Sequence, residues 1–400
     1  MLVYLVNILL IIVWALVFCT GKRTAQKKIF FVVLCFVQLY LISAFRYDVG
    51  GDYGMYTVGF FSMAVDTSNN GFFQSMTYED WEIGYILLNK IIGLFTADYK
   101  VFIMLVSVLP LIGPAYLIAR YSRNAFISVF LYVNLYLFYL DLNFIRQAIA
   151  MSILCFAYGF LKDKKFWRFL LIVALAAFFH LTVIYMIPVF LVCLLKVNTR
   201  TLLLYLFGLL FYYILSDGVL NIVLAHFHNE YSGSIFIEEG VFFYYALYPL
   251  LICMAMVFAS YYIKNLTPEM HMLIHLTLMM GFWMVVMTKH ALFERFSYYT
   301  MLFVILAVPE ILKAFKDQLK ENLIAKYTAD MEKSGEDNPR RVNAKAAKVT
   351  GQVTAIVTLS VLALAFAYNM MGLIRGAHGV IPYQTSFGWD IPSIDGLFIN

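Results

Sequence analysis

The stretch AFISVFLYVNLYLFYLDLNFIRQAIAMSILCFAYGFL, residues 125–161, decides the fold class of this chain. Asp141 and Arg146 are its only charged residues, and apolar runs of this length are typical of helices that cross a membrane. The same composition extends over all 400 residues, of which 63% are hydrophobic and 13% charged. Soluble domains are about 45–50% apolar and about 25% charged. The sequence therefore predicts an all-α, polytopic integral membrane protein and excludes a cytosolic enzyme, a disulfide scaffold and a disordered protein.

Apolar runs that suit transmembrane helices recur along the chain and predict about twelve crossings. A shorter run at 83–98 contains Lys90 and is expected to be a re-entrant or interfacial segment. The pair 168–180 and 181–195 is interpreted as a tight hairpin turning near His180, with one long tilted helix as the alternative. The other runs lie at roughly 2–20, 29–45, 101–119, 125–141, 146–161, 201–215, 241–262, 270–288, 296–312 and 349–374.

The distribution of positive charge predicts the orientation of the chain. With the N-terminus outside and 83–98 not crossing, 22 of the 29 lysines and arginines fall on inside loops, as the positive-inside rule requires. Both termini are then outside, and the first helix is expected to be retained rather than cleaved. Three regions follow: a transmembrane core at 1–312 that would hold the active site, with outer loops 46–82 and 216–240; a charged cytoplasmic loop at 313–348; and a last transmembrane helix with an outer C-terminal tail at 349–400.

Composition also limits the partners of this protein. A net charge of +5 is too small to indicate binding of nucleic acid. The five cysteines all lie in apolar runs, so they are predicted to be buried hydrophobic residues rather than disulfides or metal ligands.

Three arginines on the predicted outer side, Arg46, Arg146 and Arg295, are candidates for an anion site. An arginine at mid-helix depth costs about 2.5–3.5 kcal/mol, so such residues usually pair or serve a site. Converging guanidinium groups would bind a diphosphate through their planar forks of donors. Structural ion pairs are the alternative for each arginine, and the neighbouring partners would be Asp48, Asp141 and Glu294.

The first outer loop combines carboxylates with aromatic residues and a flexible turn. Gly50-Gly51 permits a tight turn next to Asp52, and Trp and Tyr residues accompany the acids as far as Tyr85. Aromatic rings and carboxylates suit a sugar, but the same rings suit an interfacial aromatic belt, and both interpretations stay open. His180, at the predicted outer turn, is either a structural residue or a functional one.

Five motifs on the predicted outer face, taken in order, resemble the EpsG family of Wzy-type polysaccharide polymerases. Ile381-Pro382-Tyr383 is also similar to the family's ending, whereas Gly51 stands where a small hydroxyl residue is expected and 313–348 is longer than the family pattern. The five motifs are Phe45-Arg46-Tyr47-Asp48-Val49-Gly50-Gly51-Asp52-Tyr53 with Tyr56, Glu82-Ile83-Gly84-Tyr85, Ile145-Arg146-Gln147, Phe179-His180-Leu181-Thr182 and Glu294-Arg295-Phe296.

The resemblance implies a glycosyltransferase of the bacterial cytoplasmic membrane that builds an exopolysaccharide, capsule or O-antigen. It would join oligosaccharide repeat units carried on undecaprenyl diphosphate at the outer leaflet, without a metal or another cofactor. The implied partners are the lipid-linked donor and acceptor and membrane lipid, with a chain-length regulator and a flippase as further candidates.

The resemblance also implies roles for individual residues, which we expect to gather in one pocket. Arg146 and Arg295 would bind the leaving diphosphate, with Arg46 as a third candidate. Asp52 is the first choice for the general base, with Glu82 and His180 as alternatives. The residues expected to line the sugar path are Tyr53, Tyr56 and Tyr85.

Two other functions fit parts of the sequence. A glycosyltransferase that uses polyprenyl-phosphate sugars would suit the acidic first outer loop and would need a divalent metal. A flippase of lipid-linked oligosaccharides would need polar residues at mid-span positions, and the spans nearly lack them.

Overall fold

The computed structural model describes residues 1–21, 24–73, 76–78, 81–227, 240–334 and 338–387. Within these residues the regular elements are helices and one antiparallel pair of two-residue strands, β1 (Arg46–Tyr47) and β2 (Gln384–Thr385). The prediction of an all-α membrane protein is confirmed. The chain divides into two compact units, Met1–Phe190 with Tyr368–Asn400 and Leu191–Ala367.

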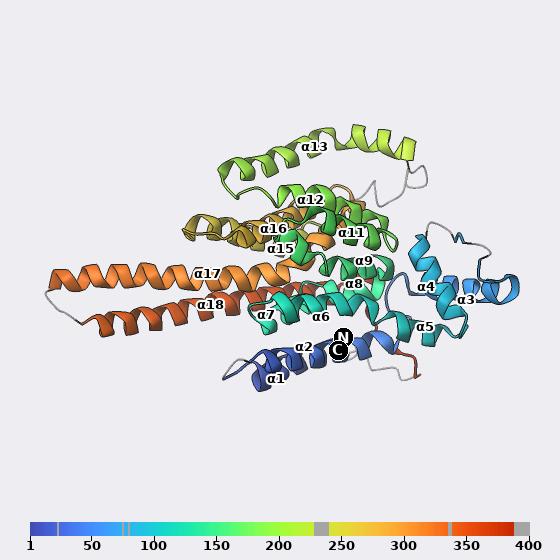
Figure 1. The fold of residues 1–400 in the computed structure, drawn as a ribbon, viewed down its shortest axis with the longest axis horizontal. Coiled ribbons are helices and arrows are strands. Elements are labelled where there is room, and N and C mark those ends of the chain that lie inside the picture. Colours follow the sequence, from blue (N-terminus) through green and yellow to red (C-terminus); the bar gives the residue numbers. More distant parts are fainter. Residues whose placement is uncertain (22–23, 74–75, 79–80, 228–239, 335–337, 388–400) are drawn as a thin grey trace, which may run out of the picture. The chain divides into compact units, whose positions relative to one another are not determined.

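The first unit is built from short helices that follow one another closely along the chain (Figure 1). Polar side chains cap several of them: Thr24 accepts from the amide of Lys27 before α2, and Asn124 accepts from the amide of Ile127 before α7. The helices are α1 (Leu2–Phe18), α2 (Ala25–Ala44), α3 (Tyr53–Asn70), α4 (Ile83–Gly93), α5 (Tyr99–Val106), α6 (Leu109–Tyr121), α7 (Ala125–Asn134), α8 (Leu137–Asn143), α9 (Ile145–Cys155), α10 (Tyr158–Lys162), α11 (Phe166–Ala177), η1 (Leu181–Tyr185) and η4 (Ala377–Gly379).

The second unit has longer helices, and two helices belong partly to each unit. Thr267 caps α16 by accepting from the amide of Met270, and Pro268 opens that helix. The helices of the second unit are α13 (Thr199–Phe227), α15 (Tyr244–Tyr262), α16 (Pro268–Val286), η3 (Ala291–Phe293) and α17 (Glu294–Ser334), and the shared ones are α12 (Met186–Val192) and α18 (Pro339–Ile374).

Seven helical segments in the described part of the chain are long and apolar enough to cross a membrane, or up to eight if the bent pair α7 and α8 forms one span. The predicted count of twelve is not confirmed. Several predicted spans coincide with apolar helices of only 10–17 residues, among them Leu2–Phe18, Ile145–Cys155 and Phe166–Ala177. The predicted turn near His180 lies between the end of α11 and the start of η1.

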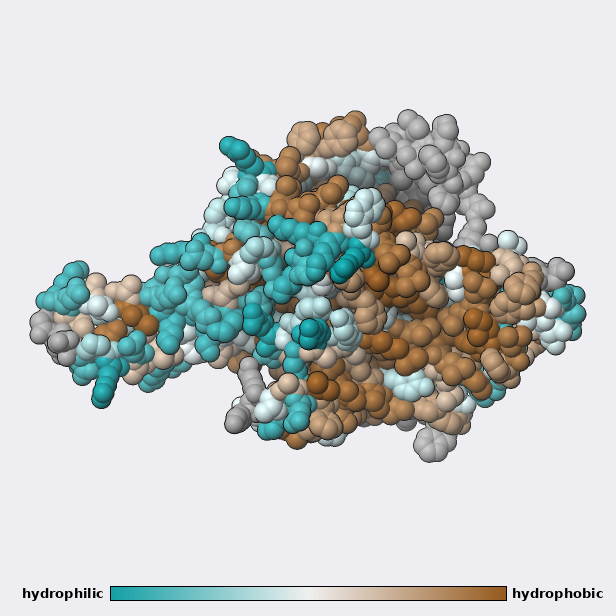
Figure 2. Space-filling view, viewed as in Figure 1, coloured by the Kyte–Doolittle hydropathy of each residue, from teal (hydrophilic) through white to brown (hydrophobic). Residues whose placement is uncertain are grey.

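The predicted loops contain more helix than expected from their polarity. The outer loop 46–82 includes α3, and α13 continues through Phe227 into the expected loop 216–240, of which 228–239 lie outside the described residues. The charged segment 313–348 consists of the end of α17 and the start of α18, which run side by side (Figure 1). The Lys345 ammonium group lies 4.4 Å from the centre of the Tyr327 ring between them. Hydrophilic residues gather over this end of the two helices (Figure 2).

Aromatic packing holds α3, α4 and α5 together in the first unit. Tyr56 and Phe60 on α3 and Tyr85 on α4 are buried in one cluster, and Phe60 stacks on Phe102 of α5 with ring centres 4.2 Å apart. This small core fixes the start of α4, where the candidate site begins.

Candidate functional site

Glu82 is held in place by the way α4 begins. It is the N-cap residue of α4 with an extended backbone, and its carbonyl accepts from the amides of Tyr85 and Ile86. The amide of Gly84 donates to the carbonyl of Phe178 at 2.8 Å. A Cβ atom at Gly84 would lie 2.6 Å from that same oxygen, so only glycine permits this approach. The start of α4 is thereby joined to the turn that carries His180.

Three donors converge on the Glu82 carboxylate. Arg146, the second residue of α9, places Nη1 2.7 Å from Oε2. On the other side, Nδ1 of His180 lies 3.0 Å and the amide of Leu181 lies 3.1 Å from Oε1. The side chains of Glu82 and Arg146 are each 16% exposed and that of His180 is 10% exposed. The structure thus brings together Glu82, Arg146 and His180, which three separate motifs contribute.

The environment of Glu82 fixes its charge. Burial alone would raise the pKa of Glu82, but the hydrogen bond to His180, the charge of Arg146 and the amide of Leu181 together lower it to about 2. Glu82 is therefore ionised at neutral pH and is a weak base. A carboxylate only accepts hydrogen bonds, so Nδ1 of His180 carries a proton, and in the neutral ring Nε2 is the nitrogen that can accept one.

Aromatic rings surround Arg146 on the side of α3 and α4. Its guanidinium carbon lies 5.8 Å from the centre of the Trp81 ring. The rings of Tyr56, Trp81 and Tyr85 pack together with centres 5.1–5.8 Å apart and are all buried. Two of the predicted sugar-binding residues, Tyr56 and Tyr85, therefore pack beside Arg146. Trp81 was given no role in the prediction, although it lies within the aromatic and acidic loop that indicated the site.

Asp52 lies on a loop that neighbouring segments hold by its backbone. The Asp52 amide donates to Oδ1 of Asn143 at 2.9 Å, and the amides of Gly50 and Gly51 donate to the carbonyls of Gly379 and His378, both at 2.9 Å. Gly50 has a φ of +104°, and a Cβ atom there would collide with the carbonyl oxygen of Leu142. Neither Asn143 nor His378 was predicted, because no local pattern links residues so far apart in sequence.

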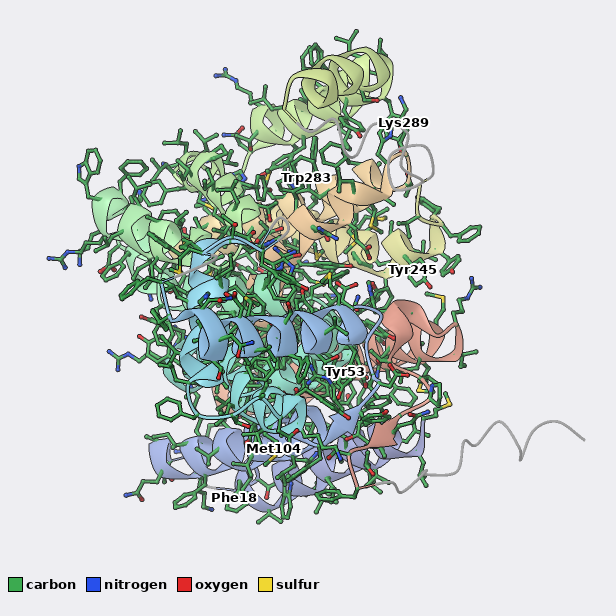
Figure 3. All side chains as sticks on the ribbon, turned by 90° about the vertical axis from the view of Figure 1, so that its right-hand side faces the viewer. Phe18, Tyr53, Met104, Tyr245, Trp283 and Lys289 are labelled. Atoms are coloured by element: carbon green, nitrogen blue, oxygen red, sulfur yellow. The ribbon has the colours of Figure 1, made fainter. Side chains whose placement is uncertain are left out.

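Arg146 and Asp52 act on the pKa of Tyr56 in opposite directions. Burial raises the pKa of Tyr56, the positive charge of Arg146 opposes the shift, and the negative charge of Asp52 adds to it. Tyr53, the first residue of α3, is marked in Figure 3. Its ring centre lies 6.0 Å from the guanidinium carbon of Arg46.

Arg46 has different partners from Arg146. It is 2% exposed, and its Nη1 donates to the carbonyl and Oγ of Ser43 at 2.7 and 2.8 Å and to Oγ of Ser107 at 3.0 Å. Among the residues that the structure describes, no carboxylate forms an ion pair with it. These contacts join the end of α2 to the end of α5. Its predicted role at the diphosphate stays a prediction.

The structural ion pairs considered for Arg46 and Arg146 are replaced by other contacts. Arg146 pairs with Glu82 rather than with Asp141, and Asp141 accepts a hydrogen bond from the Tyr132 hydroxyl inside the first unit. The hydrogen bonds of Arg46 go to serine oxygens rather than to Asp48.

Arg295 belongs to the second unit, where it is the second residue of α17 and is half-buried. Nearby, the Trp283 ring stacks on the rings of Phe293 and Phe296 with centres 5.5 and 5.0 Å apart. Figure 3 marks Trp283, on α16, and Lys289, which follows that helix. The share of Arg295 in a diphosphate site likewise stays a prediction.

Comparison with known proteins identifies the family. A family model described as the EpsG family matches residues 28–328, well over half of the chain. No curated protein and no solved structure matches. The matched range contains Glu82, Arg146 and His180. The resemblance that the motifs predicted is thus confirmed: the chain belongs to the EpsG family of polysaccharide polymerase-type membrane proteins.

Proposed function

We propose that this protein is a polysaccharide polymerase that joins oligosaccharide repeat units carried on undecaprenyl diphosphate. The observation that carries the proposal is the Glu82 carboxylate, which holds Arg146 and His180 on its two oxygens. One end of this arrangement is a permanent cation and the other is an imidazole that can accept a proton. A glycosyl transfer from a lipid diphosphate needs both functions.

In the proposed reaction an acceptor hydroxyl attacks the anomeric carbon of the donor chain. The new bond joins the acceptor oxygen to that carbon, and the bond from the carbon to the diphosphate oxygen breaks, with its electron pair leaving on the diphosphate. Arg146 stabilises the negative charge that develops there. Nε2 of His180 accepts the proton of the hydroxyl, while Glu82 stabilises the resulting imidazolium.

The geometry favours His180 over the other two candidate bases. Glu82 has a pKa of about 2 and is already engaged by three donors, so it would take up a proton only weakly. Asp52 is held by its backbone on the loop beside α3, and we assign its carboxylate to binding the acceptor sugar. Tyr53, the next residue and the first of α3, would line the sugar path.

The proposal also includes the location of the reaction. Together with the positive-inside rule, it places the protein in the bacterial cytoplasmic membrane, with both termini and the Glu82 site facing the periplasm or the cell exterior. The substrates would enter from the outer leaflet, and no metal would take part.

The proposal is tested with the purified protein in liposomes that contain lipid-linked repeat units and no other enzyme. We expect a ladder of polymer from the parent protein and from Arg168→Ala, which removes an exposed arginine of the same unit. Arg146→Ala should give no ladder although it inserts into the membrane at the parent level. Arg295→Ala tests whether Arg295 is a second ligand of the diphosphate. Normal polymer from Arg146→Ala would contradict the proposed site.

The same assay separates the alternatives. Activity that disappears with a chelator and returns with a divalent cation would favour a polyprenyl-phosphate-sugar-dependent enzyme. Transfer of intact units across the liposome membrane without polymer would favour a flippase. Of the base candidates, His180→Gln should lower kcat by about 10²–10⁴-fold, whereas Asp52→Asn should mainly raise KM for the acceptor.

A further inference from the structure

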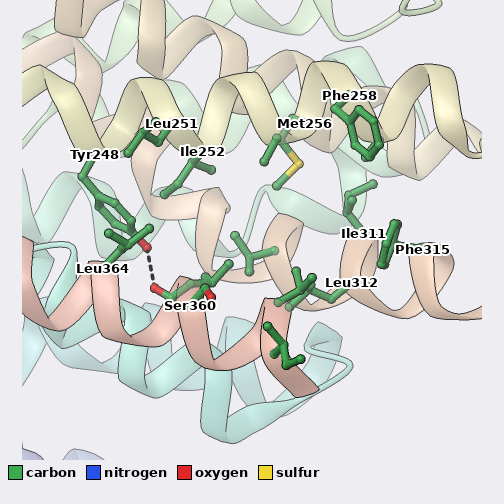
Figure 4. A pocket seen from close by; sticks show the side chains of 16 residues that line it. Tyr248, Leu251, Ile252, Met256, Phe258, Ile311, Leu312, Phe315, Ser360 and Leu364 are labelled. Carbon is green, nitrogen blue, oxygen red and sulfur yellow. Dashed lines mark hydrogen bonds between the residues drawn. The ribbon is translucent and has the colours of Figure 1, made fainter. Parts of the chain in front are cut away.

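The second unit contains an apolar groove with a volume of about 370 Å³ between α15, α17 and α18 (Figure 4). Residues between 248 and 259, 308 and 315, and 356 and 364 line it. Its polar side chains are Tyr248 and Ser360. The Tyr248 hydroxyl donates to the carbonyl of Val361 at 2.9 Å, which closes one end of the groove.

The groove is open along its length. Leu251 is 40%, Phe258 62% and Ile356 64% exposed. All three helices are long and apolar enough to span a membrane. An open apolar surface of this kind is occupied by hydrocarbon in a bilayer, because water there would contact only apolar side chains.

Positive charge gathers at the end of the groove opposite Tyr248. There the ring of Phe315 lies 5.2 Å from that of Tyr262, and the amide of Lys264 donates to Oε1 of Gln318 at 3.1 Å. These contacts bring the end of α15 against α17. Three exposed lysines lie next to the groove at this end: Lys264, Lys313 and Lys316. Asp317 pairs with Lys313, so we take the exposed Lys264 and Lys316 as the candidate contacts of a headgroup.

The length of the groove distinguishes between two kinds of lipid. From Tyr248 to Ala259, α15 rises about 17 Å at 1.5 Å per residue, close to half of a hydrocarbon core of about 30 Å. One phospholipid tail fills such a length, whereas an undecaprenyl chain is several times longer. We propose that the groove binds one acyl chain of an anionic phospholipid whose headgroup contacts Lys264 and Lys316.

The test uses tryptophan reporters in the full-length protein, which is delipidated and returned to defined lipids. Phe258→Trp places an indole in the groove, and Met254→Trp places one on the same helix outside it, where the side chain is 67% exposed. Each signal is taken as the difference from the parent protein. Brominated phosphatidylglycerol and brominated phosphatidylcholine are then compared as quenchers.

We expect brominated phosphatidylglycerol to quench the Phe258→Trp signal with a higher affinity than brominated phosphatidylcholine, by about fivefold for each lysine engaged. At Met254→Trp the two lipids should quench equally. Lys264→Gln with Lys316→Gln should remove the preference and keep the quenching by phosphatidylcholine. High salt should weaken the preference in the same way.

Three outcomes would overturn the proposal. Equal quenching by the two lipids in the groove would exclude a headgroup site, and equal preference at Met254→Trp would indicate general attraction to the surface. Recovery of Phe258→Trp fluorescence by unbrominated undecaprenyl phosphate, where unbrominated phosphatidylglycerol has no effect, would assign the groove to the polyprenyl chain. None of these outcomes depends on polymerase activity, so the proposal is independent of the proposed function.

Discussion

At the scale of single residues, the geometry of the site depends on the negative charge of Glu82. Its carboxylate receives Arg146, His180 and the amide of Leu181. Loss of that charge would remove the carboxylate that pairs with the part-buried Arg146, which is destabilising in proteins.

The first prediction concerns the pH dependence of stability. A carboxylate whose pKa falls on folding stabilises the folded state above its unfolded value, near 4.5 for Glu82, and this stabilisation is lost as the pH falls toward 2. The parent protein should therefore unfold at a higher temperature than Glu82→Gln at pH 7, and the difference should shrink below about pH 4.5. Thermal unfolding of both proteins in the same detergent measures it, and a difference unchanged at pH 3 would contradict the proposed ionisation.

The sequence predicted that Glu82, Arg146 and His180 gather in one pocket, but it did not predict the contacts that each of them makes. Glu82, Arg146 and His180 lie in motifs that indicated an outer site. Arg46 was predicted with them for the same reason, a charged residue at the end of an apolar run. The sequence does not show that its donors go to Ser43 and Ser107, because such contacts depend on how α2 and α5 pack.

At the scale of elements, Gly84 controls the position of α4 relative to the turn before η1. The second prediction compares Gly84→Ala with Gly54→Ala, a helical position on α3 with open space around it. The added methyl group at residue 84 must displace the Phe178 carbonyl. This should lower the free energy of unfolding by about 1–3 kcal/mol. It should also lower polymer synthesis, because Glu82 and His180 move apart.

Gly54→Ala should leave both the free energy of unfolding and the yield of polymer at the level of the parent protein. If Gly84→Ala and Gly54→Ala lost stability and polymer synthesis to the same extent, the helix contacts around α4 would not position the site.

The third prediction concerns the loop of Asp52. Gly50→Ala and Gly71→Ala place a side chain at similar positive φ values, +104° and +94°, but only residue 50 faces a neighbouring carbonyl. Gly50→Ala should therefore destabilise the protein by more than Gly71→Ala, which reports the backbone strain alone. Chemical unfolding of the two variants checks this difference, and equal effects would argue against tight docking of the loop on α8.

More of the helices could have been predicted from the sequence. On α3, Tyr53, Tyr56, Phe60, Met63, Ala64 and Thr67 are buried at helical spacing, yet the acidic and glycine residues before them indicated a loop. The charged segment 313–348 was predicted to be a cytoplasmic loop, whereas its described residues continue α17 and begin α18. Burial of Val342, Ala346 and Thr350, four residues apart on α18, shows that a narrow seam of small buried side chains accompanies those charges.

At the scale of the whole molecule, the direction of insertion determines which helix ends face the substrate. The fourth prediction uses single cysteines in a Cys19→Ser background, since the other four native cysteines are buried. Phe73→Cys and Phe95→Cys flank α4 at side chains that are each 85% exposed. If α4 does not cross, both should react with an impermeant maleimide in intact cells.

Lys326→Cys, near the end of α17, should react only after lysis. Labelling of residue 73 without residue 95 would show that α4 crosses, and labelling of residue 326 in intact cells would reverse the proposed orientation.

The number of crossings is harder to predict than the fold class. Hydropathy identifies every apolar run, but α9 and α11 are too short to span about 30 Å of hydrocarbon when straight. Whether such helices cross, re-enter or continue a neighbour depends on the breaks between them, and the 48° bend between α7 and α8 is invisible in composition.

The anchoring of residue 52 has a consequence for engineering. Asn143 holds this position through the main-chain amide, so exchange of the side chain leaves the tether intact. A library that varies residue 52 while keeping Gly50 and Asn143 would therefore sample new acceptor preferences on an unchanged scaffold, which makes this position a natural starting point for redirecting the polymer that is made.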